Sequence, residues 1–96
     1  MKMLLIVYSG PRPGLVPELL ERHHVDGWTE MPRAHGAGTT GRREGTRAWP
    51  GDATVFFSFA PDERAHEVIE AVGGCSRECV SGERIHAALM PVEAMV

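Results

Sequence analysis

The stretch Met3-Leu4-Leu5-Ile6-Val7-Tyr8 decides how this chain folds. All six residues are apolar or aromatic, two of them are β-branched, and the turn-forming run Ser9-Gly10-Pro11 follows. A short apolar run bounded by turn residues is typical of a buried β-strand. Because both alternations of the run are apolar, the sequence predicts a strand that is covered on both faces.

Outward from this strand, the spacing of apolar residues predicts the element order β-α-β-β-α-β. Helical spacing alternates with runs of β-branched and aromatic residues. In chain order, the further elements are a helix from Leu15 that fades at His23-His24, a strand over 28–35, a strand over 54–59, a helix that begins at Pro61-Asp62-Glu63, and a strand over 85–90.

Two local signals refine these elements. Pro32 lacks a backbone N–H, so the strand over 28–35 is expected at a sheet edge or with a bulge. Gly73-Gly74 predicts the end of the second helix, which would make 75–83 a polar linker.

The element order predicts an α+β fold of the ferredoxin-like type. Two right-handed crossovers give a four-stranded antiparallel sheet with both helices on one face. The other face would then meet water, yet the strands over 3–8 and 54–59 are apolar on both sides. We therefore expect a second copy of the chain to cover that face, which predicts a homo-oligomer.

Size and charge limit the possible functions. The 96 residues are expected to form one domain, and the net charge of −3 argues against a nucleic-acid binder. The longest apolar run is far too short to span a bilayer and does not match a signal peptide, so we expect a cytoplasmic protein. Two cysteines are too few for a disulfide scaffold.

A glycine- and arginine-rich segment over 36–51 separates the two middle strands. Its arginines, Arg42, Arg43 and Arg47, offer planar donor forks suited to phosphate or carboxylate groups. Its glycines allow the backbone to approach a ligand closely. The segment therefore predicts a site for a small anion. The alternative is a solvated loop whose arginines only keep it in water.

Two parts of the chain resemble the PII signalling-protein superfamily. The run from Trp28 to Gly38 looks like the second strand of that family with the Gly-x-Gly that leads into its T-loop. Ser81-Gly82-Glu83-Arg84-Ile85 is similar to the B-loop, and Met90-Pro91-Val92-Glu93 to the end of the last strand. The resemblance covers most of the chain and implies one domain over 1–96, a short T-loop-like segment at about 36–51, and a homotrimer.

The resemblance also implies a nucleotide site in each cleft between subunits. Carried over by position, the residues at the phosphates would be Gly36, Gly38, Gly82, Glu83 and Arg84, with Thr29 near the base or ribose. The implied effectors are ADP, AMP, ATP, a cyclic nucleotide or a small carboxylate such as bicarbonate. The implied function is regulation of a protein target, such as a membrane transporter. No motif for a catalytic nucleophile or a Walker loop is present, so we expect no enzyme.

Metal binding is the alternative function. The related CutA-like trimers share the fold and have been linked with divalent metals, and soft or borderline ligands occur here at His23, His35, Cys75 and Cys79. The two cysteines also admit a redox-sensitive disulfide near the B-loop if the second helix resumes past Gly74. Otherwise they are inert filling of the core.

Overall fold

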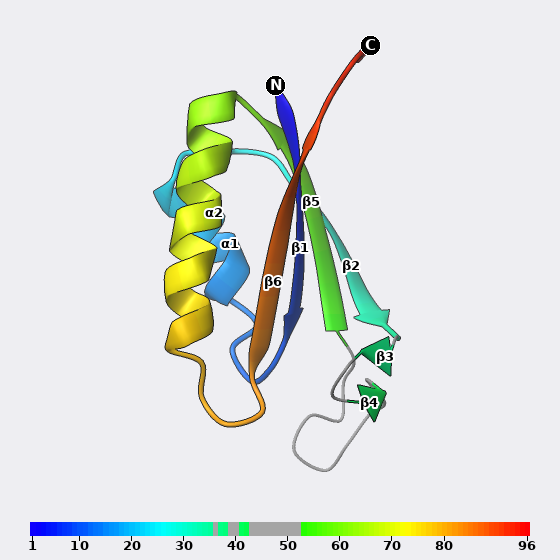
Figure 1. The fold of residues 1–96 in the computed structure, drawn as a ribbon, viewed down its shortest axis with the longest axis vertical. Helices are drawn as coiled ribbons and strands as arrows, with labels where there is room; N and C mark the ends of the chain where they lie inside the picture. Colours follow the sequence, from blue (N-terminus) through cyan, green and yellow to red (C-terminus); the bar gives the residue numbers. More distant parts are fainter. Residues whose placement is uncertain (36, 39–40, 43–52) are drawn as a thin grey trace.

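A computed structural model describes residues 1–35, 37–38, 41–42 and 53–96 of the chain (Figure 1). The predictions for Gly36, Arg43 and Arg47 lie outside these residues. The elements are β1 (Lys2–Ser9), α1 (Leu15–Arg22), β2 (Thr29–Ala34), β3 (Ala37–Gly38), β4 (Gly41–Arg42), β5 (Ala53–Ala60), α2 (Asp62–Arg77) and β6 (Arg84–Pro91).

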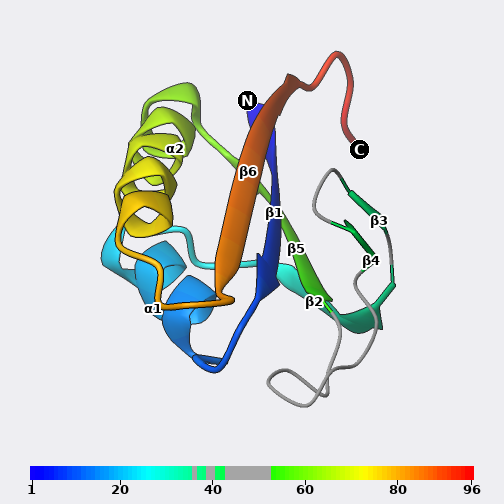
Figure 2. The same ribbon diagram turned by 60° about the horizontal axis from the view of Figure 1, so that its bottom comes forward.

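The four long strands form one antiparallel sheet in the order β2-β5-β1-β6. Figures 1 and 2 show both helices on the same face of this sheet. The predicted ferredoxin-like α+β fold is therefore confirmed. β3 and β4 pair with each other in a separate two-stranded ribbon, where the sequence predicted only a loop.

The core lies between the sheet and the helices. β1 and β5 alternate in burial, so every second side chain enters this core. The largest fully buried side chains are Leu4, Ile6, Val16, Leu20, Val68 and Ile85. In the described part of the chain, no helix combines the length and the apolar character that crossing a membrane requires.

The predicted end of the second helix at Gly73-Gly74 was wrong. Helix α2 continues through both glycines to Arg77. Two helical glycines cost roughly 1 kcal/mol each relative to alanine. Val72 is buried before them and Cys75 packs against the core after them, so tertiary contacts offset that cost. The segment that the sequence assigned to a linker therefore begins with one more helical turn.

β2 is an edge strand with a bulge, as Pro32 predicted. Met31 pairs with Val55, and the next registered pair is Ala34 with Ala53. Pro32 and Arg33 lie in the gap between these pairs, and Arg33 adopts a φ of 58°. Left-handed backbone is uncommon for a residue other than glycine, so this bulge is a distinct local conformation.

Candidate functional site

Glu83 is the centre of a buried polar cluster. Its side chain has an exposed fraction of 0%. The Tyr8 hydroxyl donates to Glu83 Oε2 at 2.5 Å, and Arg12 donates to both carboxylate oxygens, from Nε at 2.8 Å and from Nη2 at 2.5 Å. The backbone N–H of Val80 adds a fourth bond, to Oε1 at 3.2 Å. A buried carboxylate with this many donors is fully compensated.

Three segments far apart in the sequence build this cluster. Tyr8 lies near the end of β1, on the alternation that faces the helices, and Arg12 lies in the turn that follows. The Arg12 backbone N–H donates to the Tyr8 hydroxyl oxygen at 2.9 Å. Glu83 immediately precedes β6, whose first residue pairs with the last residue of β1. The β1–β6 pairing therefore brings the three side chains together.

Gly10 is required by the close approach of these groups. A Cβ at this position would lie 2.7 Å from the Tyr8 hydroxyl oxygen and 2.8 Å from Glu83 Cγ. Contacts this short force neighbouring atoms to move. The turn after β1 can therefore pass over the cluster only with glycine at residue 10.

The Glu83 carboxylate is negatively charged, and the positive charge of Arg12 neutralises it. Hydrogen bonding from Arg12 lowers the pKa of Glu83 to about 2, with help from Tyr8 and the Val80 N–H, against the effect of burial. Burial and the bond to Glu83 raise the pKa of Tyr8. At neutral pH Glu83 is therefore an ion-paired carboxylate that holds the chain in place, with a pKa far too low for a general base.

The predicted ligand residues of the last loop lie directly beside this cluster. Gly82 has a φ of 82°, a left-handed conformation that favours glycine, and Arg84 is exposed at the start of β6. Glu83, between them, turns its carboxylate into the cluster instead of outward. The structure thus brings Gly82 and Arg84 together at the surface and uses Glu83 to fix their backbone.

Of the other predicted ligand residues, Thr29 lies at the opposite edge of the sheet. Gly38 ends β3 and Arg42 ends β4, which follow the edge strand β2 along the chain, and Thr29 begins β2 in exposed position. In the order β2-β5-β1-β6, two strands separate this edge from Arg84. Three strand spacings amount to roughly 14 Å. Within one chain, Thr29 therefore lies far from Arg84.

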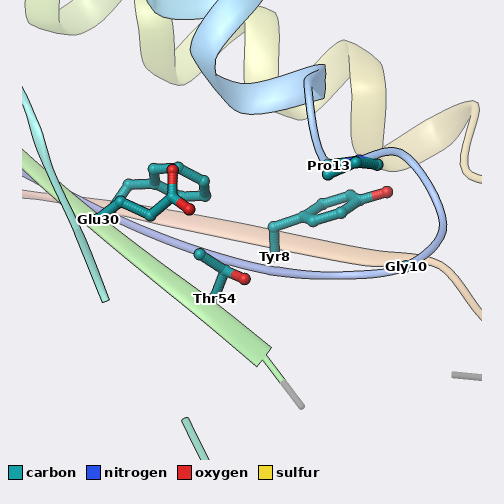
Figure 3. Close-up of a pocket in the computed structure, with 6 residues that line it drawn as sticks. Tyr8, Gly10, Pro13, Glu30 and Thr54 are labelled. Atoms are coloured by element: carbon teal, nitrogen blue, oxygen red, sulfur yellow. The ribbon is translucent and has the colours of Figure 1, made fainter. Parts of the chain in front are cut away.

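The small pocket in Figure 3 lies between these edges, on the helix side of the sheet. It measures about 80 Å³ and is lined by Tyr8, Gly10, Pro13, Glu30, Thr54 and Phe56. The Tyr8 hydroxyl points away from Glu30, so the pocket is bounded by the aromatic ring. Nucleotide-sized ligands need pockets of several hundred Å³, so this one is too small for them.

No protein-family model matches the sequence, and no curated protein does. Solved structures do match in fold. CPII of Thiomonas intermedia K12, a nitrogen regulatory PII-like protein bound to ADP, AMP and bicarbonate, superposes with a TM-score of 0.70 at 21% identity, over 93% of this chain and 86% of CPII. TTHA0516 of Thermus thermophilus, described as a putative PII-like signalling protein, gives 0.64 at 22% identity, over 92% and 82%. This chain has the PII-like fold.

Within this PII-like fold, the candidate metal ligands do not gather. His23 Nδ1 lies 3.8 Å from Glu67 Oε2, near the start of α2, whereas Cys75 and Cys79 lie at the end of that helix. Eight residues of helix separate Glu67 from Cys75, which is about 12 Å. Across the part of the chain that the structure describes, no three His, Cys, Asp or Glu side chains could hold one metal ion.

Sequence reasoning missed Tyr8, Gly10 and Arg12 as partners of Glu83. Tyr8 was interpreted as one more apolar strand residue, and Arg12 lies 71 residues from Glu83. The available signal was a hydroxyl-bearing aromatic in an otherwise aliphatic strand. Because a buried tyrosine hydroxyl usually has a hydrogen-bond partner, Tyr8 in a buried strand indicates that a polar group lies nearby.

Proposed function

We propose that this protein is a PII-like regulator that binds a small anionic effector, an adenine nucleotide or bicarbonate, in clefts between the subunits of a homotrimer. CPII, which has the same fold, is bound to ADP, AMP and bicarbonate. We further propose that the protein is cytoplasmic, has no catalytic activity, and acts on a protein target such as a membrane transporter through the T-loop-like segment at about 36–51.

The separation of the two anion-binding groups carries this proposal. Gly82 and Arg84 lie at the β6 edge and Thr29 lies at the β2 edge, with β1 and β5 between them; Gly38 and Arg42 follow β2 along the chain. A second copy of the chain that brings its β2 edge to the β6 edge of the first would complete the site. This arrangement supports a site that is completed between subunits.

The open face of the sheet supports association of several chains. Met3, Leu5 and Val7 on β1 are only half-buried there, and Phe59 of β5 is 42% exposed. Hollows of about 250 and 570 Å³ lie along the same region, the first beside Thr29 and the second beside Met3. An apolar face of this kind is typical of a subunit interface.

The Glu83 cluster prepares the β6 edge for an anion. A free carboxylate next to a phosphate would repel it, but Arg12 and Tyr8 neutralise and bury this one. The same bonds fix the backbone on both sides of Glu83, so Gly82 and Arg84 are already ordered before a ligand arrives. A preorganised loop binds with a smaller loss of conformational entropy.

The direct test combines subunit mass with ligand binding. Light scattering should give three times the chain mass of 10.5 kDa. Calorimetry should detect ADP, AMP, ATP or bicarbonate, and Arg84→Ala should weaken the bound anion about tenfold or more, because a charge-assisted contact is lost. Arg22→Ala removes the same charge at the end of α1 and should leave affinity unchanged.

Two outcomes would contradict the proposal. One is a trimer that binds none of these anions, and the other is an affinity that depends equally on Arg22 and Arg84. Zinc and copper belong in the same experiment, because binding of metal alone, lost in His35→Ala, would support the CutA-like alternative instead.

A further inference from the structure

Two free cysteines lie at the end of α2, just before the loop that leads to Glu83, and have no part in the proposed binding of an anion. Cys75 is in the last turn of α2, and Cys79 is one residue past the helix cap Glu78. Both are half-buried and both pack against the hydrophobic core. They lie where α2 gives way to the loop over 79–83, which contains Gly82 and leads to Arg84, and this position sets them apart from ordinary core residues.

The end of α2 brings the two cysteines close together. The Glu78 backbone N–H donates to the Cys75 carbonyl at 3.0 Å, so the chain is still turning when it reaches Cys79. Residues four apart on a helix have Cβ atoms about 5–6 Å apart. A disulfide needs Cβ atoms roughly 3.5–4.5 Å apart, so closing this bridge requires the residues past the helix cap Glu78 to shift by roughly 1–2 Å. Cys75 and Cys79 come this close only because the helix continues past Gly73-Gly74.

The surroundings of Cys79 connect it to the loop. Burial raises the pKa of the Cys79 thiol, and the Glu83 carboxylate raises it further. The charges of Arg12 and Cys75 also reach this thiol, with opposite effects. Within the loop over 79–83, the Glu83 N–H donates to the Val80 carbonyl at 3.0 Å. The Glu83 carboxylate at the end of the loop therefore acts electrostatically on Cys79, the first residue of the loop.

We propose that Cys75 and Cys79 form a reversible intramolecular disulfide that fixes the conformation of the loop over 79–83. The oxidant is a small-molecule disulfide. One cysteine thiolate attacks it, expels one thiolate and forms a mixed disulfide; the second cysteine thiolate then attacks the protein sulfur and expels the other. Two electrons pass to the reagent, and the protons released by the cysteines go to its two thiolates. The protein loses two hydrogen atoms.

The fold should survive this oxidation. Glu83 loses the neighbouring S–H but keeps its bonds from Tyr8, Arg12 and the Val80 N–H. The β1 pairings of Leu4 and Ile6 with β5 and β6 involve neither cysteine. The effect is therefore local: the disulfide ties the first residue of the loop to the end of α2 and leaves the sheet unchanged.

The chemical test is the intact mass of the full chain after equilibration with oxidised glutathione. We expect a protein two hydrogen atoms lighter, without attached glutathione, that regains both thiols in dithiothreitol. Cys75→Ser and Cys79→Ser are matched controls, and each should instead carry one glutathione. Wild-type protein that keeps both thiols, carries glutathione on both cysteines or forms cross-linked dimers would overturn the proposal.

The structural test is amide hydrogen exchange on the reduced and oxidised forms. The amides of Val80 and Glu83 should change their exchange rates several-fold, whereas those of Leu4 and Ile6 should not. Equal rates at Val80 and Glu83 in the two forms would overturn the effect on the loop. Neither measurement uses an effector, so both stand or fall separately from the proposed function.

Discussion

The two ends of β1 each carry an ion pair, and the two pairs differ in burial more than in distance. At the start, the Met1 ammonium lies 2.7 Å from Asp62 Oδ1, and the two side chains are 47% and 56% exposed. At the other end, Arg12 Nη2 lies 2.5 Å from Glu83 Oε1, and the Glu83 side chain has no exposed surface. Water screens the first pair and cannot reach the carboxylate of the second.

The comparison teaches that donor number and burial, more than separation, determine how much a carboxylate contributes to stability. Glu83 accepts from Tyr8, from two nitrogens of Arg12 and from the Val80 N–H. Among the described residues, the Asp62 side chain accepts one such bond, from the Met1 ammonium. Changes at the Glu83 end should therefore destabilise the fold much more than changes at the Asp62 end.

The largest effect is expected from Glu83→Gln. The amide keeps the volume but loses the charge that Arg12 and Tyr8 stabilise, and a pKa lowered to about 2 corresponds to about 3 kcal/mol of folding free energy. Arg12 is half-exposed and can turn to water, so the loss of folding free energy should lie at the low end of the range for breaking a buried ion pair. Urea unfolding measures it, with the exposed Glu78→Gln as control. Equal midpoints for the two variants would contradict the comparison.

Lowering the pH should gradually remove the stability that the ionised Glu83 carboxylate contributes. The folded pKa of Glu83 lies below its usual 4.5, so this stability is complete above about pH 4.5 and is lost as the pH falls toward 2. The difference in unfolding free energy between wild type and Glu83→Gln should shrink over that range. A difference that stays constant down to pH 2 would show that the Glu83 charge is not the cause.

Tyr8→Phe should have an intermediate effect, about 1–2 kcal/mol. The change removes one donor to Glu83 and one acceptor for the Arg12 N–H while keeping the ring in the core. Loss of the donor should also raise the pKa of Glu83, because the Tyr8 bond helps to lower it. NMR titration of the Glu83 carboxyl carbon measures this shift. An unchanged pKa in a folded variant would rule out a hydrogen bond of any strength between the two side chains.

The smallest effect is expected from Asp62→Asn. The Met1 ammonium lowers the pKa of Asp62, but both groups are solvated, and salt screens their attraction. Thermal unfolding of this variant at low and at high salt should therefore nearly coincide with that of the wild type. A loss greater than that of Tyr8→Phe would reverse the comparison on which these predictions rest.

The element order could be predicted well from the sequence and the cluster could not, for physical reasons. Apolar runs such as Met3 to Tyr8 are local signals, so the sheet could be predicted from them. The contact between Arg12 and Glu83 could not be predicted, because it forms only after β1 and β6 pair and no local pattern records a contact across 71 residues. The helix end predicted at Gly73-Gly74 was wrong for the opposite reason. The local preference of glycine to end a helix was overcome by the packing of Cys75 against the core.

The candidate ligand residues divide in the same manner. Gly82 and Arg84 follow from a short motif, and the structure places them side by side at one edge of the sheet. Glu83 belongs to the same motif, but the sequence could not indicate that its carboxylate points inward. The predictions for Gly36, Arg43 and Arg47 lie outside the described residues and stay predictions.

The bulge in β2 has a consequence for the chain before it meets any partner. An edge strand displays free N–H and C=O groups to which another polypeptide can add, the first step toward aggregation. Pro32 removes one of those donors, and the left-handed Arg33 turns the backbone out of register and keeps a cation nearby. The β2 edge of a single chain is therefore a poor site for the addition of a strand from another polypeptide.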